Sequence, residues 1–103
     1  MARLVPIIPD YQFISMNKIR CIIVDDEPLA LEILEEYASK IDLLEVVGVF
    51  DSGIAALNFV KKENVDLVFL DIQMPDLTGL QIAEMVRGQV NVIFTTAYDQ
   101  YAI

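Results

Sequence analysis

The chain contains no histidine, a single cysteine and few basic residues, and each shortage excludes a class of site. Zinc sites in proteins use His and Cys, so the absence of His and the position of Cys21 inside a predicted strand argue against zinc. One cysteine allows no internal disulfide, which favours a reducing cytoplasm as the setting. Seven Lys and Arg against 16 Asp and Glu give a formal charge of −9. This charge argues against a nucleic-acid-binding surface on this segment, because such surfaces are basic.

Long apolar runs are also missing. Hydrophobic residues make up 55% of the chain, yet no run approaches the length of a transmembrane helix. A length of 103 residues suits one small domain with a single core. The high apolar share fits a sheet that is covered by helices on both faces. We therefore expect a single cytoplasmic domain that does not contact a membrane.

An aspartate ends the most apolar stretch of the sequence. The run Val65–Leu70 is rich in β-branched and aromatic residues and predicts a strand buried on both faces. It stops at Asp71, and the Met-Pro pair and the glycine at position 79 prevent the strand from continuing. Asp71 thus lies at the carboxyl end of a strand, where open α/β sheets bind ligands. On its own, it could equally be a polar residue that ends a strand and caps a loop.

A second apolar run, Ile22–Val24, also ends in acidic residues: Asp25, Asp26 and Glu27. If the two strands were neighbours in a parallel sheet, Asp25, Asp26 and Asp71 would converge. Carboxylates packed that closely repel one another unless a cation neutralises them. Oxygen ligands suit a hard divalent ion, Mg²⁺ or Mn²⁺. Glu27, before a proline, also fits the start of a helix, where acids complement the helix dipole.

The rest of the chain alternates between helical and strand patterns. Helices are predicted at 28–40, after Asp51-Ser52 and at 80–86, with further strands at 45–50 and 91–96. The βαβαβαβ order with short connections predicts an α/β fold, a doubly wound parallel sheet with right-handed crossovers. In the flavodoxin-like strand order 2-1-3-4-5, the first and third strands are neighbours, as the acidic cluster requires. In the first helix we expect these apolar residues to be buried: Ala30, Leu31, Leu34, Tyr37, Ala38 and Ile41.

Three stretches, VDDEP, VDLVFLDIQMPDLTGL and VIFTTA, resemble in order and spacing the receiver domain of two-component response regulators. The resemblance runs from about Ile19 to the end of the chain and implies a CheY-like fold. The stretches DDEPLAL and FTTAYDQYAI look most like receivers that precede a LytTR-type DNA-binding domain. The resemblance implies a phosphorelay signalling domain, with a sensor histidine kinase as partner and transcription regulation as output. It implies no enzyme beyond one that catalyses its own phosphorylation and dephosphorylation.

The resemblance also assigns roles to individual residues. Asp71 would be the phosphoacceptor. Asp26 would ligate Mg²⁺ directly and Asp25 through water, while Gln73 would contribute its backbone carbonyl. Thr96 would be the hydroxyl residue that hydrogen-bonds the phosphoryl group and transmits the switch; from the residues alone it is an ordinary strand threonine.

The chain departs from receivers at its carboxyl end. Receivers have a fifth strand and fifth helix, and a lysine and an aromatic switch residue that contact or respond to the site. This chain stops at Ile103. We therefore expect strand order 2-1-3-4, a receiver over 17–103 that is truncated before strand five, and an upstream extension or a segment introduced by cloning over 1–16. The fourth strand would form an exposed apolar edge, which favours a homodimer or swapped dimer.

Two other functions stay open. One is a different Mg²⁺-dependent phosphotransferase that forms an aspartyl phosphate. Such families usually place an acid two residues after the nucleophile, where this chain has Gln73. The other is a pseudo-receiver that binds proteins without taking phosphate. Its usual mark is loss of an acid or of the acceptor, and none is lost here.

Overall fold

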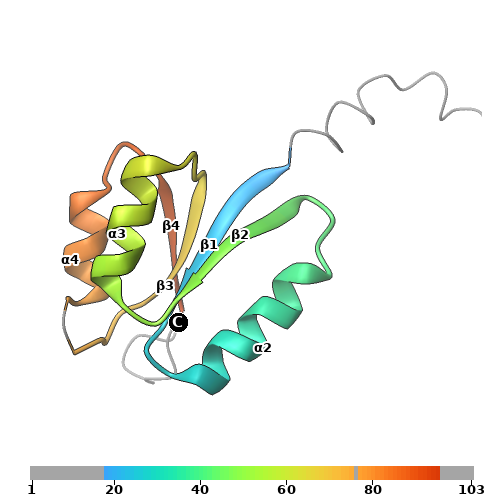
Figure 1. Cartoon of the computed structure of the whole chain (residues 1–103), viewed down its shortest axis with the longest axis horizontal. Coiled ribbons are helices and arrows are strands. Elements are labelled where there is room, and N and C mark those ends of the chain that lie inside the picture. The colour runs from blue at the N-terminus through green and yellow to red at the C-terminus, as the bar shows by residue number, and fades with distance from the viewer. Residues whose placement is uncertain (1–17, 76, 96–103) are drawn as a thin grey trace, which may run out of the picture.

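The computed structural model describes residues 18–75 and 77–95 of the chain. Four parallel strands form one sheet in the order β2-β1-β3-β4. Three helices connect them (Figure 1). In chain order the elements are β1 (Ile19–Val24), α2 (Pro28–Ser39), β2 (Leu44–Phe50), α3 (Gly53–Lys62), β3 (Leu67–Asp71), α4 (Gly79–Met85) and β4 (Asn91–Thr95).

This architecture confirms the predicted α/β fold, a flavodoxin-like parallel sheet with strand order 2-1-3-4. Each predicted helix and strand is present, with ends that differ by one residue or a few. The largest difference is at β1, which begins at Ile19, three residues before the predicted apolar run Ile22–Val24. Thr96, the predicted switch residue, lies outside the described residues. No helix within the described ranges is both long enough and apolar enough to cross a membrane.

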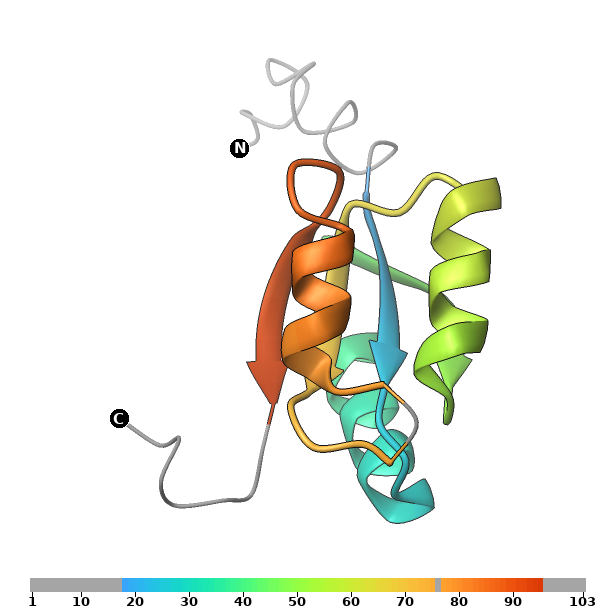
Figure 2. The same ribbon diagram turned by 90° about the vertical axis from the view of Figure 1, so that its left-hand side faces the viewer.

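The helices cover the sheet unequally. Helices α3 and α4 pack on one face and α2 lies on the other (Figures 1 and 2). The central strands β1 and β3 are the most deeply buried, because both of their faces are covered and both have neighbours in the sheet. Buried apolar side chains form a core on the α3/α4 face: Ile22, Val24, Ala56, Leu57, Val65, Val68, Leu70, Met74, Ile82 and Val86. This core fixes the positions of the carboxyl ends of β1 and β3.

Two of the apolar residues predicted to be buried in α2 and just after it are exposed instead. Tyr37 is 61% exposed and Ile41 is 50% exposed, whereas Ala38 is buried. Leu29 and Ile33, on the same side of α2 as Tyr37, are exposed as well. A helical period identifies an apolar stripe but not its width, and here only part of the stripe contacts the sheet. No described element packs on the remainder.

Strand β2 contains one residue more than its neighbour requires. Cys21 pairs with Val46, but the next residue of β1, Ile22, pairs with Gly48. The irregularity leaves Val47 without a partner in the register. Beyond it, Phe50 lies opposite Val24, and its ring packs on Phe59 of α3 with centroids 5.1 Å apart.

Strand β4 lies at the edge of the sheet and pairs only with β3 among the described elements. Its side chains Ile93 and Phe94 are 48% and 41% exposed. Consecutive side chains of a strand point to opposite faces, so both faces of β4 leave apolar surface open. The predicted position of this strand, an exposed apolar edge, is confirmed for the described residues.

Candidate functional site

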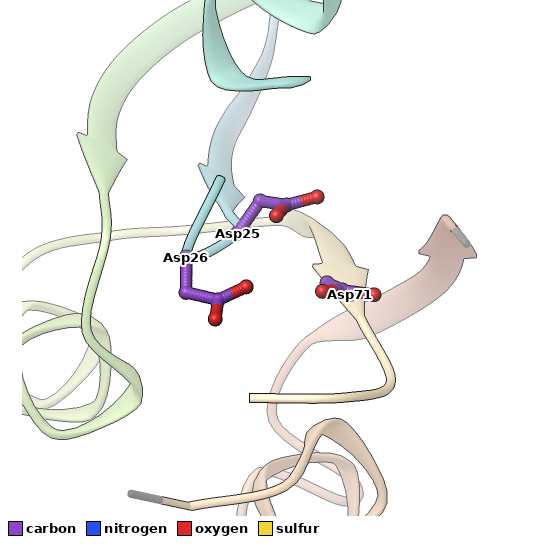
Figure 3. Close-up of side chains that lie close together, drawn as sticks. All are labelled: Asp25, Asp26 and Asp71. Atoms are coloured by element: carbon purple, nitrogen blue, oxygen red, sulfur yellow. The ribbon is translucent and has the colours of Figure 1, made fainter. Parts of the chain in front are cut away.

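Three carboxylates converge at the carboxyl edge of the sheet. Asp25 and Asp26 follow β1, and Asp71 is the last residue of β3, the strand that pairs with β1 along Cys21–Val24. One carboxylate oxygen from each of the three lies within 4.8 Å of the other two. Figure 3 shows the side chains approaching one another from the two strand ends. The predicted convergence is confirmed, and it follows from the strand order that makes β1 and β3 neighbours.

Asp25 is buried, with 7% of its surface exposed. Its backbone N–H donates to the carbonyl of Phe50 at the end of β2, at 3.1 Å. Its carboxylate Oδ1 accepts a hydrogen bond from the backbone N–H of Glu27 at 2.9 Å. Burial raises the pKa of the Asp25 carboxyl, and the negative charges of Asp26 and Glu27 raise it further, against the opposing effect of the Glu27 hydrogen bond.

Asp71 is buried to a similar extent, with 8% exposed. Its Oδ1 accepts a long hydrogen bond, 3.4 Å, from the backbone N–H of Gln73. Burial is the main cause that raises the pKa of the Asp71 carboxyl, followed by the charge of Asp25. Asp26, by contrast, is exposed. The site thus combines two buried carboxyls that resist ionisation with one that faces solvent.

A cavity of about 930 Å³ opens at this edge and contains all three aspartates. Its lining runs from β1 and α2 across the loop after β3 to the end of β4. No Lys or Arg is among the described lining residues, and none of the ion pairs found in the described ranges involves a lining residue. The negative charge is therefore uncompensated there. All-oxygen donors at this spacing fit a hard divalent cation such as Mg²⁺ or Mn²⁺.

The loop after Asp71 is held by the start of α4. Thr78 caps the helix: its side chain accepts from the N–H of Gln81, and the Gln81 side chain accepts from the N–H of Thr78 at 2.9 Å. The N–H of Gly79 donates to the carbonyl of Ile72 at 2.8 Å. The bond between Gly79 and Ile72 closes the loop that contains Gln73 at the end of β3. The side chain of Gln73 is exposed.

Gly79 has a steric role that the sequence analysis missed. A Cβ atom on Gly79 would overlap the carbonyl oxygen of Asp71 and lie 2.7 Å from the Cα of Ile72. The sequence analysis treated this glycine only as a residue that ends a strand. Glycine is a poor helix former, so its place at the first position of a capped helix was a usable signal of close packing.

Thr95 was also missed. It lies opposite Asp71 in the β3–β4 register and lines the same cavity. The sequence analysis did not single it out, because its place beside Asp71 depends on the strand register. Register between distant strands is not visible in a single sequence.

The parallel sheet and its acidic carboxyl edge define a flavodoxin-like α/β domain with an acidic site, and comparison with known proteins gives the family. The family model of the response regulator receiver domain matches residues 21–103, and the chain belongs to this family. Over 87 residues it is 42% identical to the transcriptional regulatory protein BtsR of Salmonella typhi. That alignment covers 82% of this chain and 36% of the relative, so the chain spans about a third of its length.

Solved receiver structures share the fold. The signal receiver domain of the putative response regulator NarL from Mycobacterium tuberculosis superposes with a TM-score of 0.76 at 35% identity, over 84% of this chain and 72% of that chain. RcsB from Salmonella enterica serovar Typhimurium, bound to promoter P1flhDC in the presence of the phosphomimetic BeF3⁻, gives 0.73 at 25% identity, over 81% and 44%. These relatives and neighbours do not support the LytTR subtype, which stays a prediction.

Proposed function

We propose that this chain is a phosphoacceptor module that receives a phosphoryl group on Asp71 from a sensor histidine kinase. The observation that supports it best is the convergence of Asp71 with Asp25 and Asp26, whose oxygens lie within 4.8 Å of one another in a chain of the receiver family. Transfer of a phosphoryl group demands positioning and charge neutralisation more than covalent chemistry from the protein. A carboxylate nucleophile on rigid strands meets the first demand.

The transfer step uses an oxygen of Asp71 as nucleophile. Its lone pair forms the new O–P bond while the bond from phosphorus to the donor, a phosphohistidine nitrogen or an acetyl phosphate oxygen, breaks and leaves its electron pair on the donor. Asp71 must be ionised to attack, although burial raises its pKa. The second charge, on Asp25, works against that ionisation. A bound cation would favour the ionised form of both carboxyls.

The described residues suit such a cation. Asp26 and Asp71 would ligate it directly, Asp25 would hold a ligating water, and the loop after Asp71 would turn the carbonyl of Gln73 toward it. Mg²⁺ or Mn²⁺ at this position would neutralise the charge that develops on the transferred oxygens. Thr96 would donate a hydrogen bond from its hydroxyl to a phosphoryl oxygen and shift the surface around β4. The acyl phosphate would carry a charge near −2 where the carboxylate carried −1, and this change in charge would drive the shift.

The output is a transcriptional response through a DNA-binding domain outside this chain. BtsR is named as a transcriptional regulatory protein, and RcsB was solved bound to a promoter. By analogy the module works in the cytoplasm as a signalling protein, with catalysis limited to its own phosphorylation and dephosphorylation. It is a receiver over 17–103, with residues 1–16 as an extension.

Intact mass spectrometry after incubation with acetyl phosphate and Mg²⁺ tests the proposal. We expect the wild type to gain one phosphoryl group, Asp71→Asn to gain none, and the matched variant Asp51→Asn to behave as the wild type. Asp51 is an exposed aspartate just after β2 and does not line the cavity. Equal gain in Asp71→Asn would place the chemistry elsewhere. No gain in any chain would favour a pseudo-receiver.

The open edge of β4 supports self-association. Unpaired strand edges that carry apolar side chains favour pairing with a second chain. We propose a homodimer or swapped dimer through β4, and light scattering at high concentration should give a mass above that of the monomer. The variant Ile93→Lys, which places a charge on an exposed side chain of this edge, should be monomeric. A monomeric wild type at high concentration would contradict the proposal.

A further inference from the structure

One face of the sheet is covered only in part by the described elements. Helix α2 packs over β1 and β2 on this face. Ile23 of β1 pairs in register with Phe69 of β3, which pairs with Ile93 of β4, and all three project to the α2 side. Their exposure increases away from α2: Ile23 is fully buried, Phe69 is partly buried and Ile93 is 48% exposed. A strand in the middle of a parallel sheet is normally covered on both faces, so the described residues lack a layer over β3 and β4.

The side of α2 that borders this open face is apolar as well. Leu29, Ile33 and Tyr37 follow one another at intervals of four residues, which aligns them along one side of the helix. They are exposed by 64%, 41% and 61% respectively. Ile33 lines the same cavity as Asp71 of β3 and Thr95 of β4, so this side of α2 faces the open strands. The helix and the sheet together form an apolar trough, which is defined by four side chains: Ile33, Tyr37, Phe69 and Ile93.

The first described strand begins beside the end of α2. The backbone N–H of Ile19 donates to the carbonyl of Leu43, in the loop after α2, at 2.7 Å. The amino-terminal segment, residues 1–17, precedes that point and lies outside the described residues. Ile33 is six residues before the end of α2, about 9 Å along the helix axis. Phe13 is six residues before Ile19, and an extended chain of that length spans about 20 Å, so Phe13 is within reach of Ile33.

The composition of the amino-terminal segment suits an apolar surface. Seven large apolar side chains lie within Leu4–Ile14, and two prolines in the same stretch disfavour a helix and favour the extended backbone that the reach requires. The two charged side chains of the segment, Arg3 and Asp10, cancel, so the rest of the chain carries the whole formal charge of −9. A second copy of the chain placed on this face would bring that net negative charge with it, against the exposed acids of α2. The amino-terminal segment is therefore the better occupant, and the pairing proposed through β4 uses the strand edge and not this face.

We propose that the amino-terminal segment covers the apolar trough of its own chain, in an extended conformation antiparallel to β1, with Phe13 between α2 and the open strands. Burial of a side chain as large as phenylalanine favours the docked state by roughly a factor of ten or more. Because Ile33 also lines the acidic cavity, the docked segment borders that cavity on its α2 side. The contact needs neither a metal nor a phosphoryl group, so it stands apart from the proposed function.

Tryptophan fluorescence tests the contact, because the chain has no tryptophan of its own. The variant Phe13→Trp places a single indole in the segment, and a buried indole emits at a shorter wavelength than an exposed one. We expect the folded variant to emit at a shorter wavelength than the same chain in urea, at every protein concentration. Adding Ile33→Asp puts a charge into the trough and should move the emission most of the way to the urea value. The matched control Ile54→Asp changes an isoleucine of α3, 55% exposed on the other face of the sheet, and should leave the emission unchanged.

Disulfide formation gives a second readout on the full 103-residue chain. Under mild oxidation, the pair Phe13→Cys/Ile33→Cys should close within one chain about tenfold faster than the control pair Phe13→Cys/Ile54→Cys. The native Cys21 is fully buried and should not interfere. Mass spectrometry of the non-reduced protein separates a bond within one chain from a bond between two chains.

The remaining outcomes overturn the proposal. If Phe13→Trp emits at the urea value, or responds equally to Ile33→Asp and Ile54→Asp, the segment does not occupy the trough. If the two cysteine pairs close at the same rate, the segment has no preference for this face. If the emission shift depends on protein concentration, or the disulfide joins two chains, a second copy covers the trough instead.

Discussion

Strands β1 and β3 carry charged residues near both of their ends, and the two ends handle the charge in opposite ways. At the amino end, the carboxylate of Asp66 accepts the backbone N–H of Arg20 at 2.9 Å, and the Arg20 carbonyl accepts the N–H of Asp66 at 2.8 Å. The Arg20 guanidinium donates to the carbonyl of Asn64 at 2.6 Å and lies 3.9 Å from Glu63. Donors, acceptors and opposite charges are matched there.

At the carboxyl end, three aspartates face one another, and no Lys or Arg is among the described residues that line the cavity around them. Burial and mutual repulsion raise the pKa of Asp25 and of Asp71. One end of the strand pair is arranged for stability, and the other carries repelling charges, which under the proposed function serve to bind a cation and a phosphoryl group. This is the expected trade between stability and function, and it occurs within the length of two short strands.

The largest effect should come from filling the space under Asp71. The variant Gly79→Ala places a Cβ against the backbone of Asp71 and Ile72, which belongs to the strand end and cannot move aside as a side chain can. We expect a loss of about 3 kcal/mol in the free energy of unfolding. Urea denaturation measures it. The matched control is Gly88→Asn, at a glycine with φ of 84° and open space around it, where asparagine tolerates the left-handed conformation and should cost far less.

Removing one charge at the acidic end should have the opposite sign. Asp25→Asn keeps an oxygen that can accept the N–H of Glu27 but removes a buried charge. We expect the variant to be more stable than the wild type by about 1.5 kcal/mol at neutral pH without Mg²⁺. Mg²⁺ should stabilise the wild type, because the folded chain binds it, and should have little effect on the variant. Asp51→Asn is the control. A loss of stability in Asp25→Asn would show that charge repulsion at the acidic end does not lower the stability of the wild type.

Removing the carboxylate at the amino end should cost stability. Asp66→Ala takes the acceptor from the Arg20 backbone N–H. Because this end is exposed, water replaces part of the lost bond, and we expect a loss of about 1 kcal/mol in urea denaturation. Mg²⁺ should stabilise this variant as much as the wild type. A gain in stability would contradict the contrast between the two ends.

The smallest effect is the pH dependence of the acidic end. The pKa values of Asp25 and Asp71 are raised on folding. Their contribution to stability is therefore most favourable below the unfolded pKa and is lost as pH rises through the folded pKa. We expect the advantage of the double variant Asp25→Asn/Asp71→Asn over the wild type to shrink by roughly 0.5 kcal/mol as pH falls from neutral to the point where the two carboxyls begin to take up protons, without Mg²⁺. A constant difference across that range would refute the raised pKa values.

The sequence predicted the fold and the acidic site for reasons of pattern. Apolar runs that end in Asp25 and Asp71 are local features, and the βαβ alternation makes the two strands neighbours. Features that depend on contacts between distant segments were not predictable. The closeness of Gly79 to Asp71, the register that pairs Thr95 with Asp71, and the exposure of Tyr37 all require the packed structure. The roles of Gln73 and Thr96 stay predictions.

The unpaired Val47 in β2 has a consequence for changes in chain length. Side chains alternate along a strand, so the extra residue decides which face each later side chain of β2 meets. With it, Phe50 stands beside Phe59; in a chain one residue shorter, a regular ladder would send Phe50 to the opposite layer. Position 47, whose side chain packs against the core, should therefore accept other apolar residues but no deletion. In a library of single-residue deletions, β2 should show intolerance there even though the side chain itself is only half-buried.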